Sequence, residues 1–505
     1  MSHHVLAIDE GTSSTRAIVF DREGAVVATA RRDIGSHRPH PGWVEQDPRE
    51  IWTATLEAAR SVLAHAGLAA HELCAIGIAN QRESTVIWDR ASGDPIHQAI
   101  VWSDRRTEDM CRTLREAGCE RLLAVRSGLV LDPYFSATKI AWILDTVPGA
   151  RRRAERGELA FGTIDTFLLW HLSGGTVHAT DATNASRTAL FDIRAGRWDD
   201  DLLDMFRVPR AMLPRVMDTA GLFGATLPDR LGAPVPILAI AGDQQASMIG
   251  QACTQPGTIK ATYGTGAFVL LHTGELAVRS TRRLLTTIAY QCDGRRSYAL
   301  EGSIFSAGSS IGWLRDGLGL VSSASEASQL AAQADPDQAV YLVPAFSGLG
   351  APHWSARPNA MLSGLNGSTT RREIARAALE AVAYQTHDLL HAMWADAGAA
   401  RTSSSLRVDG GVASSDWTMQ FLADMLQLPV DRAGSLEATA AGVARLAGWQ
   451  AGIYADPLRG DGTFDAERRF TPAADAVERA TRLAGWHDAV ARSVGAPTLP
   501  GGATA

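Results

Sequence analysis

The fold is decided by a stretch near the start of the chain, Val5-Leu6-Ala7-Ile8-Asp9-Glu10-Gly11-Thr12-Ser13-Ser14-Thr15-Arg16. The apolar run Val5–Asp9 predicts a strand, and two more follow at Arg16–Asp21 and Ala25–Ile34, with glycines in the turns. The first strand delivers the carboxylate of Asp9 to a glycine turn that offers backbone N–H groups and four hydroxyls. Such a turn can surround phosphate oxygens, and Asp9 can hold Mg²⁺ directly or through water. A polar hairpin without any ligand fits this stretch equally well when it is taken alone.

The hairpin is followed by a helix and a further strand. Asp47 and Pro48 are typical of the N-cap and first residue of a helix, and Gly67 is typical of its end. The run Ala75–Ala79 then predicts another strand. The start of the chain is therefore expected to alternate strands and helices.

A comparable plan returns after about residue 245. The runs Thr258–Tyr263 and Ala267–His272 predict two strands joined by Gly264-Thr265-Gly266. The later predicted elements are helices at Phe305–Asp316, Thr370–Ala397 and Ser415–Leu428 and a strand at Leu406–Asp409. Because each half opens with a hairpin around a Gly-Thr turn, the sequence predicts two α/β domains of similar build, residues 1–245 and 246–505, with a cleft between them. The tail from about Thr498 is expected to be frayed.

The composition narrows the function classes. The 48 Lys and Arg against 55 Asp and Glu give a net charge of −7, which argues against nucleic acid or an anionic membrane as the main partner. Lys139 and Lys260 are the two lysines of the sequence, and neither lies in the Gly-Lys-Ser/Thr context of a Walker phosphate loop. We find no signal peptide, no apolar run of bilayer length, and five scattered cysteines, so a cytoplasmic protein without integral membrane contact is expected.

Two further features are ambiguous in isolation. The turn Asp409-Gly410-Gly411 follows a predicted strand and would let a flat ligand approach the backbone, but alone it is a weak signal. His387 and His391 have the i,i+4 spacing of a zinc site. Residue 388 is Asp where the metalloprotease motif has Glu, so solvent-facing or interdomain histidines are the favoured interpretation over a metal site.

Longer matching phrases then indicate a family. They are Asn80-Gln81-Arg82-Glu83, Ile100-Val101-Trp102, Asp132-Pro133-Tyr134-Phe135, Asp181-Ala182-Thr183-Asn184-Ala185-Ser186-Arg187, Gly242-Asp243-Gln244-Gln245, and Ala360 to Leu365 followed by Glu373-Ile374. With these phrases, the chain from about Val5 to Val490 resembles the FGGY family of carbohydrate kinases. The resemblance implies two actin-like (ribonuclease H-like) ATPase domains that close on ATP and a polyol. Within the family, the combination of Arg82-Glu83, Trp102, Tyr134 and Asp243-Gln244 points to glycerol.

The resemblance also implies roles for individual residues. Asp243 is expected to be the general base that accepts the proton of the attacking hydroxyl. Asp9 and Asp243 are expected at the Mg²⁺. The polyol site is expected to comprise Arg82, Glu83, Trp102, Tyr134, Asp243, Gln244 and Phe268. The nucleotide site is expected to comprise Thr12, Ser13, Ser14, Arg16, Thr265, Gly308, Gly312, Gly411 and Ser415.

The chain departs from the family pattern at several positions. Glu10 stands where the family usually has Gln, and it would place another negative charge beside the phosphates. Gly312 and Ser415 stand where Gln and Asn are common, which puts the adenine-side contacts in question. Ser103-Asp104 likewise replaces a Gln-containing pair. Residues 224–236 lack both the basic loop that binds fructose 1,6-bisphosphate in enterobacterial members and the histidine that some Gram-positive members phosphorylate, so neither control is expected.

The leading hypothesis is therefore ATP-dependent phosphorylation of glycerol to sn-glycerol 3-phosphate. A sister kinase for another polyol or a ketose, such as erythritol or xylulose, is the nearest alternative. An actin-like or chaperone-like ATPase module is a remote one, because it leaves Arg82-Glu83 and Asp243-Gln244 without a role. A homodimer or homotetramer is expected from the habit of the family.

Overall fold

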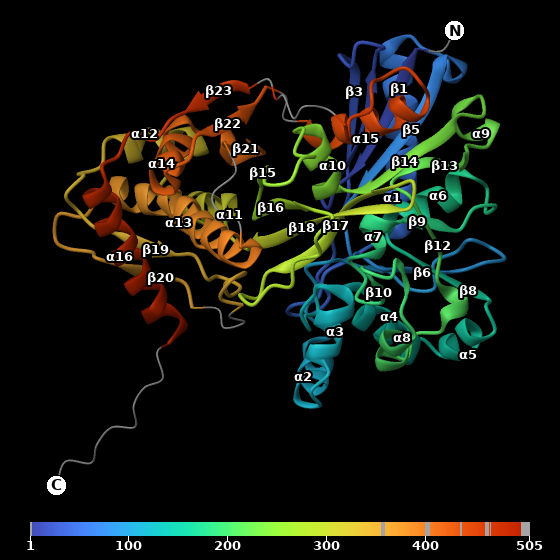
Figure 1. Cartoon of the computed structure of the whole chain (residues 1–505), viewed down its shortest axis with the longest axis horizontal. Coiled ribbons are helices and arrows are strands. Elements are labelled where there is room, and N and C mark those ends of the chain that lie inside the picture. Colours follow the sequence, from blue (N-terminus) through green and yellow to red (C-terminus); the bar gives the residue numbers. More distant parts are fainter. Residues whose placement is uncertain are drawn as a thin grey trace.

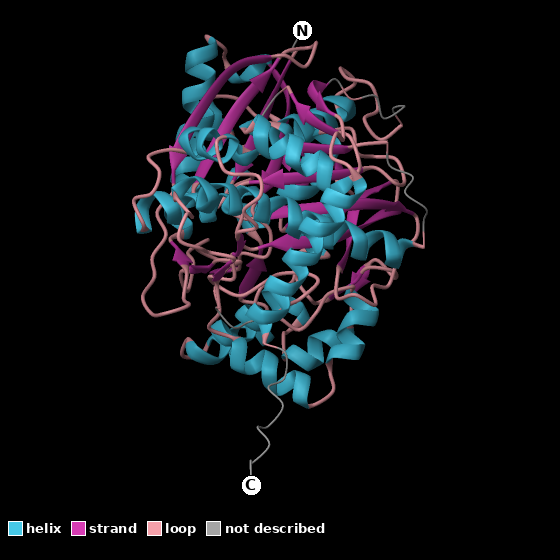
Figure 2. Ribbon diagram, turned by 90° about the vertical axis from the view of Figure 1, so that its left-hand side faces the viewer, coloured by secondary structure: helices cyan, strands magenta, loops and turns pink. Residues whose placement is uncertain are grey.

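The computed structural model describes residues 3–354, 359–398, 404–434, 437–459, 464 and 466–495. Within them, two large mixed sheets form the framework, one drawn mainly from each half of the chain (Figure 1). Helices flank the strands on both sides (Figure 2). The predicted frayed tail from Thr498 lies outside the described residues.

The first sheet has six strands in the order β13-β14-β5-β1-β2-β3. In chain order these are β1 (His4–Glu10), β2 (Ser14–Phe20), β3 (Val26–Asp33), β5 (Leu73–Asn80), β13 (Ala220–Ala225) and β14 (Pro236–Gly242). The hairpin strands β1, β2 and β3 are antiparallel, whereas β5 and β14 run parallel to β1. The three strands expected from the opening stretch are confirmed.

The second sheet repeats this arrangement with one added strand, in the order β17-β18-β16-β15-β21-β22-β23. Its strands are β15 (Ile259–Tyr263), β16 (Ala267–Gly274), β17 (Leu285–Cys292), β18 (Arg295–Ile304), β21 (Leu406–Asp409), β22 (Val430–Ala433) and β23 (Ala466–Phe470). Again an antiparallel hairpin, β15 with β16, is followed by parallel strands, β21 and β22. The shared strand order confirms two α/β halves of similar build.

The helices begin and end largely where local signals place them. They are α1 (Pro48–Ala66), α2 (Glu108–Glu116), α3 (Glu120–Ser127), α4 (Ser136–Thr146), α5 (Ala150–Glu155), α6 (Ile164–Leu172), α7 (Ala182–Ala185), α8 (Asp200–Phe206), α9 (Pro228–Leu231), α10 (Asp243–Gly250), α11 (Gly308–Gly312), α12 (Ala324–Ala332), α13 (Arg371–Ala397), α14 (Asp416–Leu426), α15 (Ala438–Gln450) and α16 (Ala476–Val494). The Asp47 side chain caps α1 and Thr370 forms a capping box with Glu373 at α13. The helix expected over Phe305–Asp316 begins later, at Gly308, and α11 continues into a π-helix at Trp313–Gly317.

Within the described part of the chain, five two-stranded sheets lie outside the two large sheets, four in the first half and one in the second. They are β4 (Glu45–Gln46) with β7 (Ala99–Ile100), β6 (Val86–Asp89) with β8 (Leu159–Gly162), β9 (Ala179–Asp181) with β12 (Arg215–Met217), β10 (Phe191–Asp192) with β11 (Arg197–Trp198), and β19 (Tyr341–Val343) with β20 (Met361–Ser363). Single 3-10 turns lie at Ala70–Glu72, Arg210–Met212 and Gly411–Ser414.

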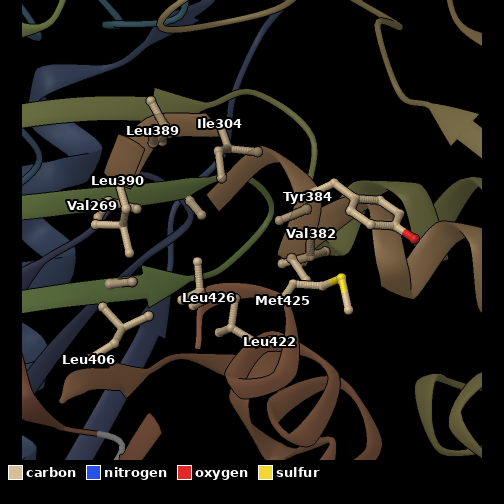
Figure 3. Close-up of a cluster of buried hydrophobic side chains, with 14 of the residues drawn as sticks. Val269, Ile304, Val382, Tyr384, Leu389, Leu390, Leu406, Leu422, Met425 and Leu426 are labelled. Carbon is tan, nitrogen blue, oxygen red and sulfur yellow. The ribbon is translucent and has the colours of Figure 1, made fainter. Parts of the chain in front are cut away.

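The core of the second half lies between its sheet and the helices α13 and α14 (Figure 3). Strand residues such as Val269 and Leu406 face Leu390 of α13, and Leu422 and Leu426 come from α14 (Figure 3). These side chains are all buried, so each removes apolar surface from water on folding. The core fixes α13 beneath the strands that carry the glycine turns.

Helix α15 crosses between the halves. Although it comes late in the chain, it packs on β1, β5 and β14 of the first sheet and on α10, and its orange ribbon lies beside the blue strands in Figure 1. The approach is close: a Cβ on Gly77 of β5 would lie 2.5 Å from the Val443 carbonyl oxygen, and one on Gly442 would lie 1.9 Å from that of Ala246. Glycine at these positions is what allows the backbones to meet. The first sheet is therefore covered in part by the second half.

Among the described residues, none of the helices is both long enough and apolar enough to cross a membrane.

Candidate active site

The site begins at the carboxyl end of β5, where the chain turns sharply through Arg82 and Glu83. Glu83 has a φ of 62°, a left-handed conformation uncommon for residues other than glycine. The Ser136 hydroxyl holds this turn by donating to the Glu83 carbonyl oxygen at 2.9 Å. The turn directs two charged side chains inward, and both are almost completely buried.

Arg82 joins the two halves. Its Nε lies 3.2 Å from Oδ1 of Asp243, the first residue of α10, and its Nη atoms bind both carboxylate oxygens of Glu301 on β18 at 2.6 and 3.0 Å. The guanidinium also lies over the Phe268 ring, 5.5 Å from its centroid. Burial opposes the charge on Arg82, but Glu301 and Glu83 outweigh it and hold its pKa well above the ordinary value. The cation is therefore permanent and fixed.

Glu83 is held by Arg187, whose Nε donates to it at 2.6 Å, while an Nη of Arg187 binds Glu301 at 2.9 Å. The result is a buried cluster of two arginines and two glutamates linked to Asp243. Burial raises the pKa of Glu83, and Arg187 counteracts part of that rise. Buried charges that are paired in this way keep their positions, although one Nη of Arg187 is buried without a partner among the described residues.

Aromatic side chains form one wall of the site. The Trp102 ring meets Tyr134 edge to face, with centroids 5.6 Å apart, and meets Phe268 in the same way at 6.1 Å. The Arg187 guanidinium lies over Tyr134 at 5.6 Å. Burial raises the pKa of the Tyr134 phenol, so its hydroxyl is a neutral hydrogen-bonding group. Apolar faces thus stand beside charged hydrogen-bonding groups.

Asp243 and Gln244 open α10 beside this wall. The Gln244 N–H donates to Oδ1 of Asp243 at 2.7 Å, the same oxygen that faces Arg82. Lys260 donates to Oε1 of Gln244 at 2.5 Å and to the Thr262 hydroxyl at 2.9 Å. The Asp243 side chain keeps about a quarter of its surface exposed, in contrast to Glu301, which has none. Asp243 is therefore the carboxylate of this group that a substrate can reach.

The hairpin of β1 and β2, which the sequence predicts to bind phosphate (the phosphate hairpin), lies against the aromatic wall. The Trp102 indole N–H donates to the Thr12 hydroxyl at 2.9 Å. Ser13 is exposed, and Ser14 is buried with its carbonyl accepting from the Gly11 N–H at 3.0 Å. This bond closes the tight turn that the glycine predicted, and the Thr12 hydroxyl lies next to Trp102, one of the residues expected to bind the polyol.

Asp9 ends β1 with its side chain buried, and Arg16 of β2 donates to it at 2.7 Å while also binding Glu437 at 2.8 Å. Burial raises the pKa of Asp9 to about 6; Arg16 opposes this rise, and the neighbouring charge of Asp243 adds to it. A divalent cation relieves the repulsion between two such carboxylates, because carboxylate oxygens are its preferred ligands. Asp9 and Asp243 therefore fit the expected Mg²⁺.

Glu10 does not carry the charge penalty expected from the sequence. It is completely buried, and burial raises its pKa well above the ordinary value, which favours the neutral acid. Gln81 donates to its Oε2 at 3.3 Å. The Oε1 of Glu10 is buried and has no hydrogen-bond partner among the described residues.

Three glycine turns of the second half meet at one place. The Gly308 N–H donates to the Gly264 carbonyl and the Ser309 N–H to that of Thr265, each at 3.0 Å. Gly410, with φ of 90°, presses on Tyr263 so closely that a Cβ would lie 2.4 Å from its carbonyl oxygen. Thr265, Gly308 and Gly411 are thereby brought together, with Thr265 and Gly411 exposed.

The remaining two nucleotide candidates differ in what they offer. A Cβ on Gly312 would meet nothing within 4 Å, so the space beside it is open. The Ser415 hydroxyl caps α14 by accepting from the Thr418 N–H at 3.2 Å, and it also contacts the Ser328 hydroxyl at 2.8 Å. That hydroxyl is already used within the protein.

Sequence reasoning missed three residues that hold the site together: Glu301, Lys260 and Lys139. Glu301 lies in mid-strand, where nothing in the sequence separates it from a surface residue. The Lys139 ammonium donates to the carbonyls of Pro133, Tyr134 and Phe135 at 2.6, 2.6 and 3.2 Å and so positions the Tyr134 loop. The sequence did carry a signal for the lysines, because they are the two lysines of an arginine-rich chain. The structure shows that both are completely buried.

Two sheets of one topology, with glycine-hydroxyl turns at the ends of their strands, define an actin-like ATPase. Residues 4–250 match the N-terminal domain of the FGGY family of carbohydrate kinases, and residues 259–451 match its C-terminal domain. The chain belongs to this family.

Curated relatives carry a narrower name. Proteins named glycerol kinase from Methylobacterium nodulans and Afipia carboxidovorans are 57% and 58% identical to this chain, over 98% and 96% of its length and 99% and 98% of theirs. A crystal structure of Plasmodium falciparum glycerol kinase with ADP is 34% identical, with a TM-score of 0.89 over 98% of both chains. A ligand-bound xylulose kinase from Lactobacillus acidophilus reaches a TM-score of 0.86 at 19% identity over 98% of this chain and 99% of its own, and shares the fold.

Proposed function

We propose that this chain transfers the γ-phosphoryl group of ATP to a terminal hydroxyl of glycerol, giving sn-glycerol 3-phosphate. The observation that carries the proposal is the bond between the Trp102 indole and the Thr12 hydroxyl. It joins the polyol wall to the phosphate hairpin, so the acceptor hydroxyl and the phosphate lie side by side. The relatives named glycerol kinase agree with this reading over nearly the whole chain.

The chemistry of the wall suits a small polyol. Three hydroxyls need charged or amide partners, which Arg82, Glu83 and Gln244 supply. The thin carbon backbone needs apolar faces, which Trp102 and Phe268 supply at a centroid separation of 6.1 Å. Tyr134 and Asp243 complete the set. A site that bonds each hydroxyl rejects analogues that lack one, because its buried polar groups are then left unpaired.

Asp243 acts as the general base. Arg82 and the Gln244 N–H both contact its Oδ1, which fixes the orientation of the carboxylate and leaves Oδ2 to accept the proton of the attacking hydroxyl. In phosphoryl transfer the proton moves late and positioning dominates, so the fixed geometry of this carboxylate is as important as its basicity.

The hairpin of β1 and β2 supplies the groups that bind the negatively charged phosphates. Thr12, Ser13 and Ser14 offer hydroxyls and backbone N–H groups to the β- and γ-phosphates, and Arg16 offers its guanidinium to the transferring group. Asp9 and Asp243 would hold Mg²⁺, which when bound neutralises phosphate charge. Thr265 faces the phosphates from the second half. Gly308 and Gly411 line the nucleotide site, and Gly312 and the backbone at Ser415 border its outer end.

The proposal extends to the roles of the two halves, the cellular location and the oligomeric state. Residues 1–245 would bind the polyol, phosphates and Mg²⁺, and residues 246–505 the nucleotide, with the two halves closing over a cleft. The five cysteines are all free thiols, which suits the cytoplasm. A homodimer or homotetramer remains expected from the family, and sedimentation velocity measures it directly.

The proposal is tested by a substrate panel with ATP and Mg²⁺. We expect glycerol to give the highest kcat/KM, at least about tenfold above erythritol and xylulose, since larger acceptors need room that Trp102 and Phe268 occupy. A higher value for erythritol would assign the chain to the sister kinases. Slow ATP turnover that no polyol stimulates would favour the ATPase module instead.

Lys139 predicts a pH dependence of polyol affinity. Burial lowers its pKa to about 8, so raising the pH from 7 to 9 removes the proton from the folded protein. The ammonium has three N–H donors for three carbonyls, whereas the neutral amine has two. We therefore expect the KM for glycerol to rise about threefold to tenfold over this interval, the loss of roughly one hydrogen bond. Initial rates at fixed saturating ATP measure it.

The matched control for this pH effect is Lys139→Met, which should have a raised KM that no longer changes between pH 7 and 9. The stability linkage has the opposite sign. Between about pH 8 and the unfolded lysine pKa near 10.4, the unfolded chain binds more protons at this site, so Lys139 makes stability rise with pH. A loss of affinity at pH 9 is therefore not a loss of fold. An unchanged wild-type KM would remove Lys139 from the positioning role.

Regulation by fructose 1,6-bisphosphate is expected to be absent. The segment after β13 passes through the short helix α9 to β14 without a basic glycine-rich loop. We expect millimolar fructose 1,6-bisphosphate to change kcat/KM by less than about 20%, because exposed single charges bind such an anion weakly. A clear drop in activity would show a site elsewhere.

A further inference from the structure

A cluster of imidazoles surrounds one carboxylate on the far side of α13 from the sheet. Asp388 is its centre: Nε2 of His487 lies 3.1 Å and Nδ1 of His387 lies 3.4 Å from Oδ1, and Nε2 of His353 lies 3.6 Å from Oδ2. These residues come from three segments, namely α13, α16 and the loop after β19. None of them takes part in the polyol or phosphate chemistry.

This arrangement corrects the interpretation made from the sequence. His387 was expected to face solvent or the other domain with His391. It is instead buried, with 5% of its surface exposed, although the two rings do lie close, with centroids 4.2 Å apart. The partner that completes the cluster, His487, is about 100 residues further along the chain. The spacing along one helix therefore identified His387 but could not identify His487, which comes from another helix.

We propose that His387, Asp388 and His487 form a binding site for a divalent transition metal of the zinc class, which links α13 to the C-terminal helix α16. One ligand atom from each of the three lies within 4.8 Å of the others. Two imidazole nitrogens and a carboxylate oxygen are the donor set of Zn²⁺ and its neighbours, not of Mg²⁺.

The distances suit a bound ion. With metal–ligand bonds of about 2.0–2.1 Å, the edge of a coordination tetrahedron is about 3.3–3.4 Å. The two nitrogen–oxygen separations at Oδ1 are 3.1 and 3.4 Å, so an ion can enter with small side-chain movements. Three protein ligands leave the fourth position for water.

The carboxylate is already oriented for such a role. The Trp486 indole N–H donates to Oδ2 of Asp388 at 2.8 Å, and that indole is itself buried and stacked on Tyr384. An outer partner that fixes a metal ligand in this way is a regular part of metal sites. Nε2 of His387 is buried and, among the described residues, has no hydrogen-bond partner. The His487 side chain is 56% exposed, which gives an ion a path from solvent.

The test uses the full chain without an affinity tag, stripped with a chelator and dialysed against Zn²⁺ alone. We expect one Zn²⁺ per chain with a Kd at or below about 10 μM. Co²⁺ in its place should give the intense visible absorption of a four-coordinate or five-coordinate ion. At 100-fold excess over the Kd, Zn²⁺ should raise the unfolding temperature by about 2–3 °C for a chain of this length. No binding at 50 μM Zn²⁺ would overturn the proposal.

Variants locate the site. Asp388→Asn and His487→Ala should each weaken Zn²⁺ binding about 100-fold and abolish the thermal shift. His65→Ala, an exposed histidine on α1, and the double variant His3→Ala/His4→Ala at the N-terminus should leave binding unchanged. If His391→Ala abolishes binding while His487→Ala keeps it, the ion belongs to the helical pair and the three-residue site is wrong. Unfolding of each variant without metal, followed by circular dichroism, separates lost ligands from lost fold.

Discussion

Replacing Asp243 by asparagine is expected to reduce kcat by about 10²–10⁴-fold, the usual contribution of a general base, while glycerol binding changes by less than about threefold. Asparagine keeps the shape of the side chain and an oxygen for the Gln244 N–H and the Arg82 Nε, so the local geometry persists. What it lacks is a group that can take the proton. Single-turnover rates and glycerol binding measured by calorimetry separate the two effects.

The matched control is Asp200→Asn at α8, another helix-opening aspartate, which is exposed and paired with Arg210. It should retain full activity. If Asp243→Asn keeps more than a tenth of the wild-type kcat, another group accepts the proton. If both glycerol binding and kcat are lost together, Asp243 is a binding group first and the assignment as base fails.

Replacing Glu301 by glutamine is expected to be the most destabilising conservative change in the site. Glu301 has no exposed surface and neutralises Arg82 and Arg187 at once. Removing one partner of a buried ion pair leaves an uncompensated charge and costs about 3–5 kcal/mol. For a chain of this length that is a fall of about 3–5 °C in unfolding temperature if it unfolds as one unit. Thermal melts monitored by circular dichroism measure it.

The same substitution should also lower kcat/KM, by at least about 100-fold, because glutamine keeps one of the two oxygens that accept from Arg82 and puts an NH₂ donor in place of the other, so Arg82 loses one of its two bonds and the opposite charge. The control is Glu467→Gln, whose exposed carboxylate pairs with Arg432 across 3.3 Å and whose loss should cost less than about 1 kcal/mol. An unfolding temperature for Glu301→Gln within 1 °C of the wild type would show that the buried ion-pair cluster does not stabilise the contact between the two halves.

Local chemistry made the framework predictable. Gly11 and the carboxylate of Asp9 mark the end of β1, Asp47 and Gly67 mark both ends of α1, and these signals depend only on neighbouring residues. The candidate site residues could be named because they stand in the longer phrases that resemble the FGGY family. Arg82 and Asp243, for example, each follow a strand of the first sheet, and parallel strands end at the same edge.

What could not be predicted depends on contacts between distant segments. Glu301 acquires its role from Arg82, more than 200 residues earlier, and a glutamate in the middle of a strand looks like a surface residue until its partner is placed. The charge state of Glu10 follows from complete burial, which only the packed structure reveals. His487 joins His387 through the docking of α16.

The position of α15 bears on how the protein can be made. A ribosome delivers β1, β5 and β14 first, but α15, which covers their apolar face, begins nearly 200 residues after β14 ends. At about 5–20 residues per second this is an interval of about 10–40 s. During it the small buried side chains of that face, such as Ala79, Ala239 and Ala241, have no cover from Val443 and its neighbours. The first half is thus completed by the last third of the chain, and one face of its sheet lacks its final cover until translation is nearly finished.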